Sequence, residues 1–235
     1  MLNNMDIAGN GTVGSGEYDR ITISGMGKVV GDIKSKSLDV SGLGKSIGVI
    51  NSENINISGK FTTYAFIEST KQIEINGCIT CKDGMKGKDI RINGYAKVLS
   101  KIQFDNLEIN GAIKGLNGAE GRKFLSEGVV NIDGLLSADY ININMFKTSK
   151  IKEIGGEEIV VRRRTHGGFS EIFFKGNLVS DVIEGDKIYL ERTKAKVVRG
   201  GDITIGIGSV IDRVEYSKNL SINDGAIVKE KILIG

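Results

Sequence analysis

The chain has 235 residues, 33 of them glycine and none of them proline. Its formal net charge of +3 is too weakly basic to favour nucleic acid as a partner. No apolar run is long enough to cross a bilayer and no secretory signal is recognisable, which predicts a cytoplasmic protein.

Residues 1–18 are polar and glycine-rich, with weak patterning. We expect them to form either a flexible N-terminus or a small cap over the next segment. In the second case Leu2, Met5 and Ile7 would supply the apolar contact.

Residues 19–154 are dominated by an internal repeat. Six similar segments, from DRITISGMGKVVGDI to DNLEINGAIKGLNGA, follow one another, and each contains an anchoring glycine at the same place. These glycines are Gly25, Gly42, Gly59, Gly77, Gly94 and Gly111. Their spacing is constant except for one extra residue between Gly59 and Gly77, and after Gly111 the period is interrupted and then resumes. A fixed period just below twenty residues predicts a solenoid of stacked coils.

Apolar residues recur at fixed distances from each anchoring glycine. Positions four and two before the glycine are aliphatic and the position between them is polar, an alternation typical of a strand with one buried face. These two inward columns are Ile21, Leu38, Ile55, Ile73, Ile90 and Leu107, and Ile23, Val40, Ile57, Ile75, Ile92 and Ile109. A third column, eight residues after the glycine, comprises Ile33, Ile50, Ile67, Met85, Ile102 and Ala119.

The pattern predicts an all-β fold, a parallel β-helix (β-solenoid) with coils of about 17 residues. Serine or asparagine precedes each anchoring glycine, as is typical of bends. Stacking in register would place Glu74, Arg91 and Glu108 next to one another on one outer face, with alternating charge.

Residues 155–235 predict a less regular continuation of the β-helix, because alternating apolar pairs recur there with variable spacing. The stretch near 162–176, RRRTHGGFSEIFFKG, fits no coil and predicts a protruding loop. Its Arg162, Arg163 and Arg164 would either contact an anion or a membrane, or form a solvated basic loop.

Two short motifs resemble functional sites, but we expect no catalytic residue, cofactor or metal. The segment GLGKS at 42–46 resembles the end of a phosphate-binding loop, but Asp39 occupies the position of the required first glycine. Cys78 and Cys81 form a C-x-x-C without a second pair of ligands, and the only histidine, His166, is distant in sequence.

The repeats ISGMGKVVGDI, VSGLGKSIGVI and INGAIKG resemble those of the bactofilins, bacterial polymer-forming cytoskeletal proteins, and the segment at 183–217 resembles the second half of longer Gram-positive members. The resemblance implies a right-handed helix and nucleotide-independent filaments, built by end-to-end stacking in the cytoplasm and often at the inner face of the membrane. It also implies the protein itself or a paralogous bactofilin as partner, with peripheral membrane or envelope proteins as further partners.

We therefore expect a non-enzymatic scaffold that self-associates through its terminal coils, since uncovered strand edges pair with other chains. The residues expected at the two ends are Ile21 and Ile23, and Leu220, Ile222, Ile232 and Ile234. Two alternatives stay open. One is a carbohydrate-active β-helix enzyme or binding module, which predicts a groove with clustered carboxylates but is disfavoured by the low aromatic content of 6%. The other is an adaptor that binds anionic membranes or nucleic acid through the arginine run.

Overall fold

The computed structural model describes residues 2–163 and 176–234, which form two units. The first unit extends to Asn117 and the second begins at Gly118. The sequence analysis placed the change in regularity at 154/155 instead. The structural boundary lies in the stretch where the regular spacing of the anchoring glycines stops, after Gly111.

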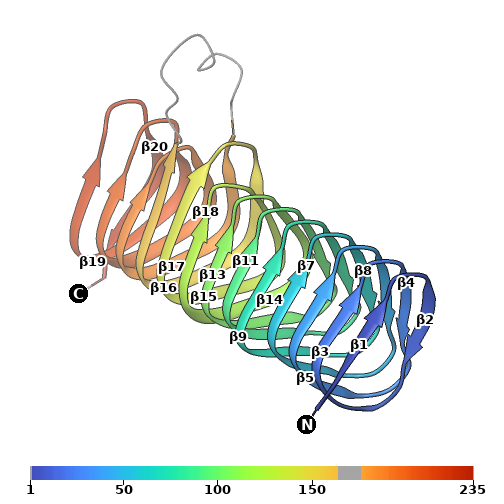
Figure 1. Cartoon of the computed structure of the whole chain (residues 1–235). Helices are drawn as coiled ribbons and strands as arrows, with labels where there is room; N and C mark the ends of the chain where they lie inside the picture. The colour runs from blue at the N-terminus through green and yellow to red at the C-terminus, as the bar shows by residue number, and fades with distance from the viewer. Residues whose placement is uncertain (1, 164–175, 235) are drawn as a thin grey trace. The chain divides into compact units, whose positions relative to one another are not determined.

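Each coil of unit 1 consists of one long strand followed by one short strand, and successive coils are stacked (Figure 1). The long strands are β1 (Asn3–Ile7), β3 (Gly16–Ile23), β5 (Ile33–Val40), β7 (Ile50–Ile57), β9 (Ile67–Ile75), β11 (Met85–Ile92) and β13 (Lys101–Ile109). The short strands are β2 (Asn10–Val13), β4 (Met26–Val29), β6 (Leu43–Ser46), β8 (Lys60–Thr63), β10 (Cys78–Cys81) and β12 (Tyr95–Val98), and β14 (Ala112–Ser126) begins in this unit.

The strands of unit 1 pair in parallel with the equivalent strands of the neighbouring coils. Ile50 of β7, for example, lies beside Ile33 of the preceding coil and Ile67 of the following coil. The one longer spacing between anchoring glycines is absorbed in β9, where the register shifts between Ser52 and Asn54 of its partner β7. This β-bulge keeps the flanking columns aligned.

The three inward columns predicted from the sequence are confirmed. Each of their members is buried, with at most 2% of its surface exposed. Buried and exposed positions alternate along most of β5 and β7, and β-branched residues are found at the buried positions, as at Ile50, Ile55 and Ile57 of β7.

The short strands contribute further inward positions that the sequence analysis missed. Phe61 is fully buried and packs in the space above Gly44, where any Cβ would collide with the phenyl ring. Ser46 and Thr63 are also buried, and each hydroxyl donates a hydrogen bond to the carbonyl two residues later, at 2.8 Å. These small polar residues thus satisfy backbone carbonyls at the bends after β6 and β8.

The anchoring glycines lie at a bend where consecutive backbones approach closely. A Cβ added to Gly77 would collide with the carbonyl oxygen of Gly59, and one added to Gly94 would collide with that of Gly77. The requirement for glycine at this column is therefore steric.

The first residues of the chain are neither a flexible terminus nor a separate cap. β1 and β2 form a coil of their own, in which Met5 and Ile7 lie beside Ile21 and Ile23 of β3. Figure 1 shows β1 and β2 as the outermost strands at the N-terminal end of unit 1. Met5 and Ile7 stand four and two residues before Gly9, so the repeat begins one coil earlier than expected.

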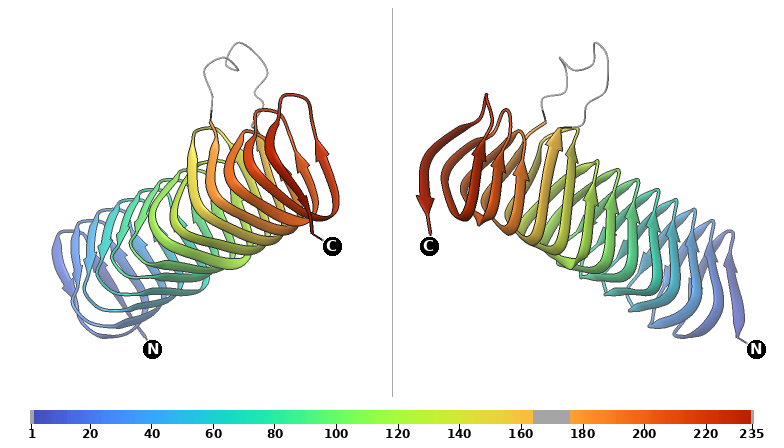
Figure 2. Two further views of the ribbon diagram at one scale, coloured as in Figure 1. Left: turned by 180° about the vertical axis from the view of Figure 1, so that it is seen from behind. Right: turned by 90° about the vertical axis from the view of Figure 1, so that its left-hand side faces the viewer.

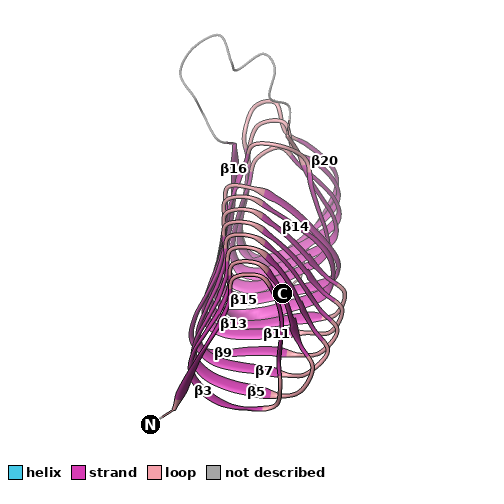
Figure 3. Ribbon diagram, turned by 45° about the vertical axis from the view of Figure 1, so that its right-hand side comes forward, coloured by secondary structure: helices cyan, strands magenta, loops and turns pink. Residues whose placement is uncertain are grey.

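Unit 2 is also a parallel β-solenoid. Beyond the end of β14 it contains β15 (Val129–Met145), β16 (Ser149–Arg163), β17 (Leu178–Leu190), β18 (Thr193–Ile205), β19 (Val210–Ile222) and β20 (Ile227–Leu233). Its coils vary in length, because the step from Ile141 to its neighbour Ile159 is longer than the step from Ile183 to its neighbour Val198. No helix is drawn among the residues described in Figure 3.

The step from β16 to β17 is the longest in unit 2. Ile154 and Ile183 lie side by side although they are much further apart in sequence than other column neighbours. The predicted loop near 162–176 falls within this step, but residues 164–175 lie outside the described residues.

Candidate functional site

The two ends of the repeat are the candidate site, because a solenoid exposes unpaired backbone and uncovered core columns there. Ile21 and Ile23, expected at the N-terminal end, are wrongly assigned. Both are fully buried in the second coil, covered by Met5 and Ile7. The N-terminal end is formed instead by β1 and β2, which among the described residues of unit 1 pair only with β3 and β4.

Two inward columns of unit 2 end at Leu220 and Ile222 without a described strand that covers them. Leu220 lies beside Ile203 and Ile222 lies beside Ile205, and both of these isoleucines of the preceding coil are buried. β20 covers β19 only from Val210 to Tyr216, and no other described strand of unit 2 lies over Leu220 or Ile222. Both side chains are consequently half-buried rather than buried.

The last strand, β20, differs from the expected arrangement. Lys231 lies beside Val214, so a lysine and not an isoleucine ends the buried column of Ile154, Ile183 and Val198. The two views in Figure 2 show this strand as the outermost one at the C-terminal end of unit 2.

Ile232 and Ile234 do not continue the buried column of Val198 and Val214. Ile232 is half-buried beside Glu215, whose carboxylate Oε2 is 2.6 Å from Nε of Arg199. Ile234 is 36% exposed and lines a surface groove. The alternating isoleucines of KILIG imitate an inward pattern, whereas the register places Lys231, the residue before them, beside Val214.

That groove has a volume of about 720 Å³ and lies entirely in unit 2. Its lining includes the glycine column Gly156, Gly185 and Gly200 and four carboxylates, Glu153, Glu157, Glu184 and Asp186. Arg199 also lines it, with Nη1 3.4 Å from the Glu184 carboxylate. No aromatic ring is among the lining residues.

The structure describes two residues of the arginine run, Arg162 and Arg163. The guanidinium of Arg162 stacks over the ring of Tyr189, 5.4 Å from its centroid. The Tyr189 hydroxyl donates to Oε1 of Glu191 at 2.6 Å, and this hydrogen bond, together with partial burial, raises the pKa of the phenol. The backbone N–H of Arg163 donates to the other oxygen of Glu191, and Arg164 lies outside the described residues. An anion or membrane contact at this run stays a prediction.

The remaining motifs occupy structural positions. GLGKS forms the bend and strand β6, with Gly44 facing Phe61. Cys78 is exposed and Cys81 is buried, so the two thiols diverge as expected from an extended strand. Within the described residues no group of three or more His, Cys, Asp or Glu side chains could hold a metal ion. His166 lies outside them.

Two proteins of Bacillus subtilis (strain 168) are similar to part of the chain. The uncharacterized protein YhbF is 41% identical over 102 residues, which is 42% of this chain and 41% of YhbF. The uncharacterized protein YhbE is 36% identical over 100 residues, 42% of each chain. The match thus spans about two fifths of the length of these curated relatives.

No protein-family model matches the chain, and no solved structure matches it. Among the described residues, no helix has the length and apolar character that crossing a bilayer would require.

Proposed function

We propose that the protein is a non-enzymatic scaffold that assembles with itself by stacking coils end on end. The open end of unit 2 in one copy would meet the first coil of unit 1 in the next, without a nucleotide. The observation that supports this most directly is the pair of inward columns ending at Leu220 and Ile222, half-buried and with no described strand of unit 2 over them.

The N-terminal coil offers a complementary surface. Met5 ends one inward column of unit 1 and is half-buried, and among the described residues of this unit its column is covered from one side only, by Ile21. Ile7 and Val13 of the same coil are already buried. Apolar columns on both surfaces would then be removed from water, and the backbone ladders would continue from one copy to the next.

Lys231 weakens this contact. Lys231 is exposed, and a charged residue at the end of a core column limits uncontrolled edge-to-edge pairing. Stacking would bury the ammonium or force it to the rim, and either outcome costs free energy. Assembly is therefore expected to require high protein concentration.

The proposal agrees with the bactofilin resemblance of the repeats, and membership of that family is part of the proposal. A cytoplasmic polymer of this chain alone, or with a paralogue, would serve as a platform for envelope proteins. The proposal places this polymer at the inner face of the membrane.

Light scattering of the purified chain across a concentration series, without nucleotide, tests the proposal. Ile222→Glu should abolish the concentration-dependent rise in scattering while the circular dichroism spectrum stays unchanged. Val179→Glu is the matched control, because Val179 is 37% exposed on β17, between Lys150 and Lys194 and away from the ends. Equal scattering by the Ile222→Glu variant and the unsubstituted protein would refute stacking at this end.

A carbohydrate-directed role is the second candidate, because four carboxylates line the groove of unit 2. Its lack of lining aromatic rings makes it the weaker candidate. Incubation with a panel of polysaccharides, monitored by reducing-end release, tests it. Turnover that disappears in Glu184→Gln would favour this candidate over the scaffold.

A further inference from the structure

The short-strand face of unit 1 combines exposed apolar side chains with lysines. We define this face as the outward residues of β2, β4, β6, β8, β10 and β12, the residue that follows each of these strands, and Ala112 and Lys114 of β14. Apart from Leu2, every large hydrophobic residue of unit 1 that is exposed lies on it. These residues are Met26, Val30, Leu43, Ile47 and Tyr64, with exposures between 40% and 54%.

The charge on this face has one sign. Its lysines are Lys28, Lys45, Lys60, Lys82, Lys97 and Lys114. The face contains no aspartate or glutamate, and within the described residues none of these lysines forms an ion pair. The ammonium of Lys45 lies over the ring of Tyr64, with Nζ 4.8 Å from the centroid.

The stacking register places like charges next to one another. Lys28 lies directly beside Lys45, and Lys97 lies directly beside Lys114. Like charges in adjacent strands repel, so these columns are unfavourable in the free protein. An anionic surface laid against the face would relieve the repulsion.

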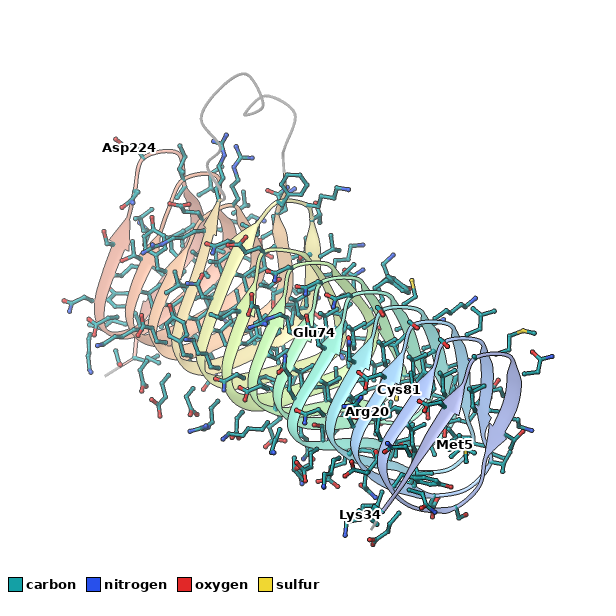
Figure 4. All side chains as sticks on the ribbon, in the orientation of Figure 1. Met5, Arg20, Lys34, Glu74, Cys81 and Asp224 are labelled. Atoms are coloured by element: carbon teal, nitrogen blue, oxygen red, sulfur yellow. The ribbon has the colours of Figure 1, made fainter. Side chains whose placement is uncertain are left out.

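The long strands of the same unit are arranged differently. Lys36 pairs with Asp19 at 2.6 Å, Lys71 with Glu53 at 2.7 Å and Lys86 with Glu68 at 2.8 Å, each across neighbouring coils. Lys34, Glu74 and other polar side chains project from these strands, while Cys81 lies inside (Figure 4). Four lysines of the long strands, Lys34, Lys36, Lys71 and Lys86, are thus paired with carboxylates, whereas none on the short-strand face is paired within the described residues.

The apolar residues decide which anionic partner fits. Met26 and Leu43 are column neighbours, 54% exposed each, and with Lys28 and Lys45 they border a shallow hollow of about 490 Å³. A nucleic acid backbone would leave these apolar side chains in water. A bilayer surface takes up apolar side chains at the level of the acyl boundary and lysines at the level of the phosphates. A second copy of the face would meet it with the same charge.

We propose that the short-strand face of unit 1 docks on an anionic lipid bilayer, with Lys28 and Lys45 at the headgroups and Met26 and Leu43 at the acyl boundary. The surface belongs to unit 1 alone, so docking does not depend on whether copies stack. It is also separate from the arginine run of unit 2.

Vesicle flotation tests this, because lipid-bound protein rises in the gradient while self-assembled protein sinks. Phosphatidylcholine vesicles with about 30 mol% phosphatidylglycerol should carry the protein upward at about 0.1 M salt and much less at about 0.5 M. Vesicles of phosphatidylcholine alone should not.

Two double variants separate the contributions of charge and apolar contact. Lys28→Glu with Lys45→Glu should lower the bound fraction about tenfold or more. Met26→Ser with Leu43→Ser should lower it several-fold and leave the remaining binding sensitive to salt. The control, Lys71→Glu with Lys86→Glu, makes the same change in net charge on the long strands and should retain binding.

Three results would overturn the proposal. They are absence of flotation with anionic vesicles, an equal loss in the control variant, and tighter binding of duplex DNA that displaces the vesicles in a fluorescence competition. The last result would assign the face to nucleic acid instead.

Discussion

Asn93 and Asn76 are joined across two coils by a hydrogen bond from Nδ2 of Asn93 to Oδ1 of Asn76, 2.7 Å long. Asn110 repeats the contact by donating to Oδ1 of Asn93 at 3.0 Å. Arg91 and Glu108 meet in the same way, with Nε 3.1 Å from Oε2. Side chains at equivalent positions of neighbouring coils therefore stack in register on the outside as well as in the core.

Replacing the middle residue of the asparagine ladder removes two of these bonds. Asn93→Ala should lower the free energy of unfolding by about 1 kcal/mol, the net value of exposed hydrogen bonds lost together. Urea unfolding followed by circular dichroism measures it. Asn51→Ala is the control, because Asn51 is exposed on β7 without a side-chain hydrogen bond among the described residues. An equal effect in both variants would show that the ladder adds nothing.

The bend glycines should be far less replaceable than other glycines. Gly77→Ala places a Cβ against the Gly59 carbonyl and should destabilise unit 1 by about 2 kcal/mol or more, since backbone must shift. Gly14→Ala should change stability by less than about 0.5 kcal/mol, because no atom lies within 4 Å of the added Cβ. Thermal unfolding of the two variants gives the comparison, and a tolerated Gly77→Ala would contradict the close approach of the coils.

The two cysteines should differ in reactivity. Burial raises the pKa of the Cys81 thiol to about 12, while Cys78 is exposed. Iodoacetamide at mildly alkaline pH should modify Cys78 in the folded protein and both thiols after unfolding, as read by mass spectrometry. Rapid labelling of native Cys81 would place it outside the core.

The same thiol links stability to pH. Its pKa is raised in the folded state from an ordinary value of 9.0 to about 12, so the unfolded chain loses this proton first as the pH rises. The contribution of Cys81 is therefore complete below pH 9.0 and decreases as the pH rises toward about 12. Cys81→Ala should flatten that decline in urea midpoints, and an unchanged slope would show that another group causes it.

Most of the fold of unit 1 could be predicted from the sequence, because its core columns consist of the aliphatic residues that mark a buried strand face. Ile55 and Ile57, for example, stand at their predicted positions and are buried. Fewer core positions could be predicted where small residues fill the core. Ser46, Thr63 and Cys81 form a buried column whose members share hydrogen bonding to the following bend rather than hydrophobicity.

Contacts that depend on the strand register could not be predicted from the sequence either. The asparagines before the bend glycines were read only as residues typical of bends, but Asn93 and Asn110 each bond the asparagine of the neighbouring coil. At the C-terminal end, the register places Lys231 beside the buried Val214, and no local pattern in the sequence shows this. The short-strand face was missed because its lysines and apolar residues gather only when the coils stack.

Lys231 should weaken self-assembly. Lys231→Leu would extend the apolar column of Val198 and Val214 to the open end, and it should lower the concentration at which scattering begins by about tenfold, about 1.4 kcal/mol. Lys229→Leu is the control, because Lys229 faces outward and pairs with Asp212 at 2.7 Å. If Lys231→Leu left the onset unchanged, the end of unit 2 would not be the stacking surface.

Negative-stain electron microscopy of the unsubstituted protein, concentrated and free of nucleotide, tests the central proposal most directly. Stacking of terminal coils predicts filaments of uniform width whose length grows with concentration. Single particles only, at the highest concentration and across several salts, would contradict self-assembly.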